Sequence, residues 1–94
     1  MSHMNISETL RALSDPTRQD ILMLLRAGRM NAGDIASHFN VTNATVSYHL
    51  RILKKADLIC EIKEKNFIYY YLNSSVLDDL MLWLIRFGRR TANE

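Results

Sequence analysis

Two apolar helical patterns that lie only three residues apart constrain this chain more than any other feature. Ile35, Ala36 and Phe39 form one apolar face of a short helix, and residues 43–56 carry a second, longer helical pattern. Residues 40–42 form the turn between them, with Thr42 in the position of an N-cap for the second helix. A short helix, a three-residue turn and a longer helix have the spacing of a helix-turn-helix.

The segments before this motif predict two further helices. Apolar residues recur at helical spacing within residues 5–13. Asp15 as the N-cap and Pro16 in the first turn begin a second helix. That helix is expected to end near Gly28, because glycine readily takes the backbone conformation that follows a helix.

The second half of the chain changes from a helical to an alternating hydrophobic period. Residues 58–64 and 67–72 are rich in β-branched and aromatic side chains and predict two strands of a hairpin. Lys65 and Asn66 form its tip, where we expect Asn66 to take the left-handed conformation. A last helix is predicted over residues 76–87. The predicted fold is therefore mainly α with a two-stranded β-hairpin wing, a winged helix-turn-helix of order α-α-α-α-β-β-α.

Length and composition indicate one small globular domain. The 94 residues are 48% hydrophobic, with only three Gly and one Pro. We expect residues 1–4 to be a remnant of cloning, residues 5–90 to form the single domain, and residues 91–94 to be a tail. The lone Cys60 excludes an intrachain disulfide, and the longest apolar run falls far short of the about 20 residues that span a bilayer. These features predict a cytoplasmic protein.

The helix over residues 43–56 has one apolar and one polar face. At 100° per residue, Val46, Leu50 and Leu53 fall on the inward side. His49 lies beside them, and we expect it to be a packed, hydrogen-bonded structural residue. The segment 41–56 contains three basic residues and no acidic one, so the outward face is positively charged.

The outward residues of this helix suit contact with DNA. Short polar side chains and tyrosine can hydrogen-bond base edges in the major groove, whereas Arg and Lys bind phosphates. An ordinary solvated helix face is the alternative. The expected base-edge contacts are Asn43, Ser47 and Tyr48, and the expected phosphate contacts are Arg51, Lys54 and Lys55.

The hairpin tip also carries residues that suit contact with the DNA backbone. Lys63, Lys65 and Asn66 lie at or near the tip, where a wing would contact flanking phosphates or the minor groove. An ordinary solvated hairpin is the alternative. Arg18 and Arg26 are either further phosphate contacts or plain surface charges, and both interpretations stay open.

Three segments together resemble a known protein family. Residues 13–18 (LSDPTR), 46–53 (VSYHLRIL) and 69–72 (YYYL) are similar to the ArsR (arsenical-resistance repressor) family of small bacterial regulators. The resemblance implies a homodimeric repressor that binds an imperfect inverted repeat at its own promoter. The chain most resembles the sporulation-delay (SdpR-type) autorepressor branch, which implies a membrane immunity protein as a partner. By position, the resemblance places Asn43, Ala44, Ser47 and Tyr48 in the groove, and Thr42 and Thr45 near phosphate.

Metal sensing, which is common in this family, is not expected here. The family's thiolate sites lie on the third helix, which has no cysteine in this chain, and the last helix has Asp78 and Asp79 but no histidine. Two carboxylates alone bind zinc or a softer metal poorly. We therefore expect no metal, no cofactor and no enzymatic activity, although a sensor using an unrecognised metal or redox site remains an alternative. Cys60 is interpreted as a packed apolar residue, with a redox switch as the alternative.

The last helix is apolar on nearly all sides, which predicts burial against more than one neighbour. A helical dimer interface shared with the first helix explains this pattern, and a central core helix in a monomer is the alternative. A protein-interaction module is the rival function, because the net charge of +2 is small for a nucleic-acid-binding protein. The expected dimer residues are Ile6, Leu10, Leu13, Leu77, Leu80, Met81, Trp83, Leu84 and Phe87.

Overall fold

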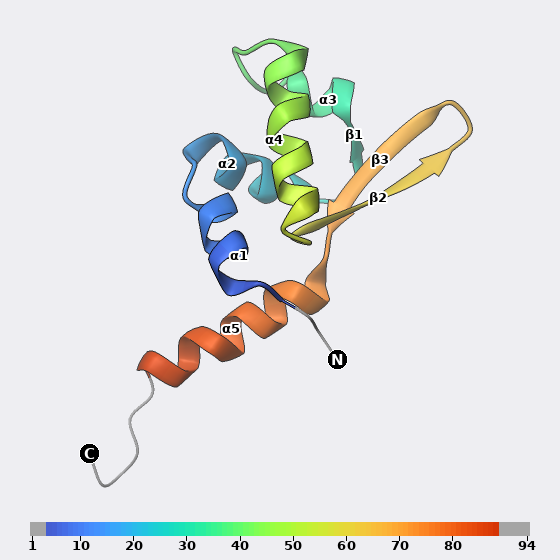
Figure 1. Ribbon diagram of the computed structural model, residues 1–94. Helices are drawn as coiled ribbons and strands as arrows, with labels where there is room; N and C mark the ends of the chain where they lie inside the picture. The colour runs from blue at the N-terminus through green and yellow to red at the C-terminus, as the bar shows by residue number, and fades with distance from the viewer. Residues whose placement is uncertain (1–3, 89–94) are drawn as a thin grey trace, which may run out of the picture.

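The computed structural model describes residues 4–88, and Figure 1 shows a helical body with a projecting hairpin and a long last helix. The expected remnant, apart from Met4, and the expected tail lie outside the described residues. Met4 itself packs against the core. The elements in chain order are α1 (Ile6–Leu13), α2 (Pro16–Leu25), β1 (Met30–Asn31), α3 (Ala32–Ala36), α4 (Asn43–Lys55), β2 (Ile59–Glu64), β3 (Phe67–Leu72) and α5 (Ser74–Gly88).

One apolar core holds α1 to α4 and the base of the hairpin together. Ile21 of α2, Ile35 of α3 and Leu58, just before β2, are fully buried. The inward residues predicted for α4 are buried in the same cluster, which confirms the orientation of that helix. Burying a side chain of this size contributes about 1.5–3 kcal/mol. The core therefore fixes which face of α4 points outward.

Local capping signals in the sequence set where three helices begin. The side chains of Asp15, Asn31 and Thr42 accept hydrogen bonds from the backbone N–H groups three residues later, as expected for N-caps. Pro16 is the first residue of α2. Gly28 follows the end of α2 with a φ of +139°, a conformation that residues with a Cβ rarely adopt.

The sheet has three antiparallel strands in the order β1-β3-β2, so the prediction of two strands was incomplete. Met30 and Asn31 of β1 pair with Tyr70 and Tyr69 of β3. Two residues are too short to show an alternating pattern, and their pairing arises only from contact with a distant segment. β2 and β3 pair along their whole lengths and form the predicted wing.

At the hairpin tip, Lys65 rather than Asn66 takes the left-handed conformation, with a φ of 58°. The expectation for Asn66 was therefore wrong. Glu64 pairs with Phe67, which leaves Lys65 and Asn66 as a two-residue loop. The position of a residue within this two-residue loop, rather than the general preference of Asn for positive φ, decides which residue takes the left-handed conformation.

Helix α5 begins at Ser74, two residues before the predicted start, and points away from the body (Figure 1). Three of the expected dimer residues, Leu13, Leu77 and Leu80, are wholly or partly buried within the single chain. The distal part of α5 leaves large apolar side chains in solvent, and Phe87 is 73% exposed. Among residues 4–88, no helix combines the length and apolar character that crossing a membrane requires.

Candidate nucleic-acid interface

The outward face of α4 brings the predicted base-contacting residues together. Asn43, Ala44, Ser47 and Tyr48 are all exposed and lie in the first half of the helix. Tyr48 is 51% exposed although it is a large aromatic residue. Figure 1 shows the amino-terminal end of α4 at the edge of the body, where a second molecule has access to it.

Thr42 and Thr45 are occupied by local hydrogen bonds at the start of α4. The Thr42 hydroxyl accepts the Thr45 N–H at 3.1 Å, and the two hydroxyl oxygens lie 2.9 Å apart. Thr42 is exposed and Thr45 is half-buried. Both threonines therefore fix the first turn of α4, and a phosphate contact by either remains a prediction.

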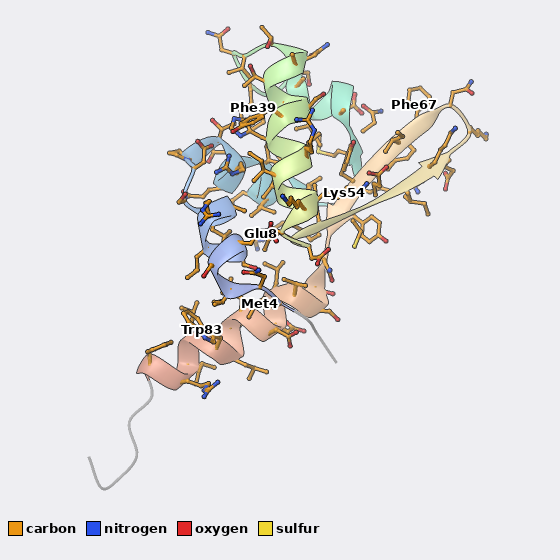
Figure 2. The ribbon with its side chains drawn as sticks, in the orientation of Figure 1. Met4, Glu8, Phe39, Lys54, Phe67 and Trp83 are labelled. Atoms are coloured by element: carbon orange, nitrogen blue, oxygen red, sulfur yellow. The ribbon has the colours of Figure 1, made fainter. Side chains whose placement is uncertain are left out.

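The three basic residues of α4 have different surroundings. Arg51 and Lys55 are exposed, and the Lys55 Nζ lies 3.9 Å from a carboxylate oxygen of Glu8. Lys54 forms an ion pair with Glu61 of β2, and this contact raises the pKa of Lys54. The structure therefore places Lys54, which is labelled in Figure 2, as a link between α4 and the wing, whereas Arg51 and Lys55 are exposed.

The wing tip keeps its positive charge because the nearby carboxylates are paired. Arg29 donates two hydrogen bonds to Glu64, at 3.1 and 2.8 Å, which lowers the pKa of Glu64. The Arg29 guanidinium also lies 4.3 Å from the centre of the Tyr69 ring. Lys65 and Asn66 are exposed at the tip beyond Glu64, and Lys63 is exposed just before Glu64 on β2, as the wing prediction requires.

One basic residue beside α4 was missed by the sequence analysis. A surface hollow between α1 and α4 is lined by Glu8, Arg11, Tyr48, Ile52 and Lys55, among others. Arg11 is exposed there, on the same side as Tyr48. Only the packing of α1 against α4 brings Arg11 close to the proposed DNA-contacting face, so no local sequence signal could have identified it.

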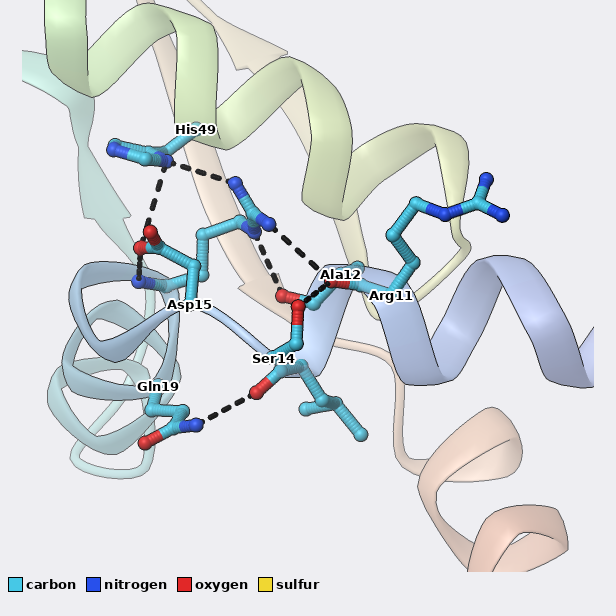
Figure 3. A network of polar contacts seen from close by, with 8 residues as sticks. Arg11, Ala12, Ser14, Asp15, Gln19 and His49 are labelled. Carbon is cyan, nitrogen blue, oxygen red and sulfur yellow. Dashed lines mark hydrogen bonds and ion pairs between the residues drawn. The ribbon is translucent and has the colours of Figure 1, made fainter.

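Arg18 is 8% exposed, so the interpretation of it as a plain surface charge was wrong. Its guanidinium bonds to backbone carbonyls of α1 and to the ring of His49 (Figure 3), and we therefore assign Arg18 a structural role. His49 is also 8% exposed, which confirms that it is a packed structural residue. Arg26 is exposed at the end of α2.

Asp15 joins the same network as the N-cap of α2. Its Oδ2 accepts the Arg18 backbone N–H at 3.0 Å and lies 3.9 Å from the Nδ1 of His49. This hydrogen bond is the main cause that lowers the pKa of Asp15, and the nearby His49 and Arg18 also lower it. The charged form of Asp15 is therefore favoured in the folded protein.

We expect the contribution of the Asp15 charge to stability to disappear in acid. Because the folded pKa is lowered, the stabilisation is present above the unfolded value and is lost as the pH falls below about 4. Urea unfolding of the wild type and Asp15→Asn at pH 7 and pH 3 measures this, since Asn retains the cap but not the charge. A stability difference that stays constant over this range would contradict the assignment.

The described residues contain no group of three or more His, Cys, Asp and Glu side chains placed to hold a metal ion. Asp78 and Asp79 lie on α5, and one carboxylate oxygen of Asp79 is buried without a hydrogen-bond partner within residues 4–88. Cys60 is half-buried on β2, opposite Tyr71.

Comparison with known proteins supports the predicted family. The family model described as "Bacterial regulatory protein, arsR family" matches residues 15–61, which include α2 to α4 and the start of β2. The transcriptional repressor SdpR of Bacillus subtilis (strain 168) is 45% identical over 89 residues, which cover 95% of this chain and 99% of that repressor. The similarity to the SdpR-type branch is thereby confirmed.

Solved structures agree on the winged helix-turn-helix fold. A crystal structure of a possible transcriptional regulator for arsenical resistance matches with a TM-score of 0.79 and 30% identity, covering 88% of this chain and 86% of that chain. The homodimeric winged helix-turn-helix DNA-binding domain of a possible ArsR-family regulator from Mycobacterium bovis matches with a TM-score of 0.73 and 25% identity, covering 88% and 78%. This chain therefore belongs to the ArsR family of bacterial regulatory proteins, which are DNA-binding transcriptional regulators and not enzymes.

Proposed function

We propose that this protein is a homodimeric repressor that binds an inverted-repeat operator at its own promoter in the cytoplasm. The observation that carries the proposal is the exposed, acid-free outward face of α4, which presents small and polar side chains at its first turns. The similarity to SdpR over nearly the whole chain supports repression as the outcome of binding.

The proposed contacts divide into base reading and phosphate binding. Asn43, Ser47 and Tyr48 hydrogen-bond base edges in the major groove, where Ala44 allows close approach of the helix. Arg51 and Lys55, together with Arg11 across the hollow, bind phosphates beside the groove. Further contacts to the DNA backbone are proposed for Thr42 and Thr45 at the start of α4, and for Lys63, Lys65 and Asn66 of the wing. Lys54 is assigned to the contact between α4 and the wing.

The proposed dimer uses the apolar residues that the single chain leaves exposed. Met81, Leu84 and Phe87 of α5 and Leu10 of α1 are each at least 40% exposed, and Trp83 packs edge-on against Phe87. Ile6 and Leu13 lie half-buried on α1. The homodimeric relative from Mycobacterium bovis supports this assembly. A two-fold dimer of this kind presents two α4 helices about 34 Å apart, one turn of DNA.

We propose that a partner protein, rather than a metal, releases the repressor from DNA. The cysteine-free third helix and the histidine-free last helix support this, since thiolates and imidazoles are the usual ligands of zinc and softer metals. The similarity to the SdpR-type branch favours a membrane immunity protein as the partner. Stoichiometric zinc or haem in the purified protein would overturn this part of the proposal.

Hydroxyl-radical footprinting on DNA from upstream of the protein's own gene tests the proposed assembly. We expect two protected patches related by a two-fold axis, with centres about 10–10.5 base pairs apart or a multiple of that spacing. A single protected patch would indicate a monomer on one half-site and would contradict the inverted repeat. No protection at any concentration would favour the rival, a winged helix that binds protein.

Arg51→Ala and Lys54→Ala are expected to differ in the salt dependence of DNA binding. The logarithm of the DNA-binding constant falls linearly with the logarithm of the salt concentration, and each lost phosphate contact makes this slope shallower by about 0.9. Arg51→Ala should therefore reduce the slope by about one contact, whereas Lys54→Ala should leave it nearly unchanged because Glu61 already neutralises Lys54. Equal reductions, measured by fluorescence anisotropy at several salt concentrations, would show that Lys54 leaves Glu61 to bind DNA.

A further inference from the structure

The guanidinium of Arg18 connects three helices within one buried network. Its Nε donates to the carbonyl of Ala12 at 2.7 Å and its Nη2 donates to the carbonyl of Arg11 at 3.3 Å, both in the last turn of α1. Its Nη1 lies 3.2 Å from the Nδ1 of His49, in the middle of α4 (Figure 3). Arg18 belongs to α2, so one side chain from this helix holds the end of α1 and the centre of α4 at the same time.

The chemistry of the contact fixes the direction of the hydrogen bond to His49. An arginine side chain has donors and no acceptor, so the Nδ1 of His49 accepts the hydrogen bond from Nη1. The His49 ring also meets Tyr48 edge-on, with 5.3 Å between ring centres. The network thus reaches directly to a proposed base-contacting residue.

The buried Arg18 side chain orients the helices around it in addition to stabilising the core. The last carbonyls of a helix lack partners within the helix, and a positive charge there is favourable. A planar guanidinium with several fixed donors bonds three acceptors in defined directions, which a lysine ammonium on a flexible stem does not reproduce. The contact therefore defines an angle between α1 and α4 in addition to holding them together.

We propose that Arg18 and His49 are positioning residues that set the placement of α4 relative to the dimer helix α1, and hence the spacing of the two DNA-contacting helices. This inference rests on the proposed function, because it assumes that α1 is part of the dimer interface and that α4 contacts DNA. Arg18 and His49 touch no DNA in this proposal. They act through the backbone of α1 and through the ring of Tyr48.

The test compares two kinds of variant. The first kind breaks the contact between Arg18 and His49, and the second removes another hydrogen bond between α2 and the end of α1 that does not involve α4. Arg18→Lys keeps the charge but loses the fork, and His49→Phe keeps a ring beside Tyr48 but loses the acceptor. Gln19→Ala is the matched control, since Gln19 also donates from α2 to the end of α1, to the Leu13 carbonyl at 2.7 Å. Circular dichroism and light scattering first establish the temperature at which each variant is a folded dimer.

Affinity is then measured for the footprinted operator, for operators with the half-sites moved by one base pair, and for a random duplex. We expect Arg18→Lys and His49→Phe to weaken binding to the operator at least about tenfold and to lose most of the preference for the natural half-site spacing. Their affinity for the random duplex should stay within about twofold of the wild-type value. Gln19→Ala should behave like wild type on all duplexes. Folded, dimeric Arg18 and His49 variants that keep the wild-type affinity and spacing preference would overturn the proposal.

A wild type that never prefers the operator over random DNA would overturn the proposed function itself, rather than this inference.

Discussion

Replacing Ser47 and Tyr48 by alanine is expected to remove most of the protein's preference for its operator while leaving its binding to random DNA nearly intact. Both side chains are exposed on the outward face of α4, and neither carries a charge at neutral pH. Base-edge contacts contribute about 1–3 kcal/mol of discrimination each, whereas random binding depends mainly on phosphate contacts. The double variant should therefore lose operator affinity by at least about 100-fold.

Two conservative variants separate the parts of the Tyr48 contact. Tyr48→Phe removes only the hydroxyl and keeps the edge-on contact with His49. Tyr71→Phe is the matched control, since Tyr71 is similarly exposed but lies on β3 of the wing. Competition titrations with operator and random duplexes measure the discrimination. A uniform loss of affinity on both duplexes would contradict base reading by Ser47 and Tyr48.

Introducing a charge into the distal part of α5 is expected to convert the protein into a folded monomer that no longer binds its operator tightly. Leu84 is 49% exposed and Phe87 is exposed still further, so glutamate at either position leaves the core of the single chain intact. In a two-fold interface each substitution occurs twice and buries two unpaired carboxylates. We expect the dimer dissociation constant to rise at least about 10³-fold.

Sedimentation equilibrium and circular dichroism together measure this outcome. Met23→Glu is the control, because Met23 is also a largely exposed apolar residue but lies on α2. The control should remain a dimer, and both α5 variants should keep the helical signal of the wild type. Dimeric Leu84→Glu and Phe87→Glu proteins with full operator affinity would show that the subunits associate through another surface.

Features of the fold that depend only on residues close together in the sequence could be predicted from the sequence. Asp15 and Thr42 were identified as N-caps because a cap needs only its own side chain and an N–H three residues later. The inward face of α4 followed from helical periodicity alone, and burial of Val46, Leu50 and Leu53 confirms it.

Features that join distant segments could not be predicted. Arg18 and His49 are 31 residues apart, and Arg29 and Glu64 are 35 apart, so only the folded chain reveals that they meet. The strand β1 exists because two residues reach the edge of β3. These contacts explain why Arg18 is structural and why the wing lysines keep their charge. The DNA contacts themselves remain predictions, since they depend on a partner molecule.

The measurement that tests the central claim most directly is a fluorescence-anisotropy titration with DNA from upstream of the protein's own gene and with a scrambled duplex, at two salt concentrations near physiological. A specific repressor should prefer its own DNA by about 10³-fold or more, and its affinity should fall as salt rises. Equal, weak and salt-sensitive binding to both duplexes would contradict the claim that the outward face of α4 reads this promoter.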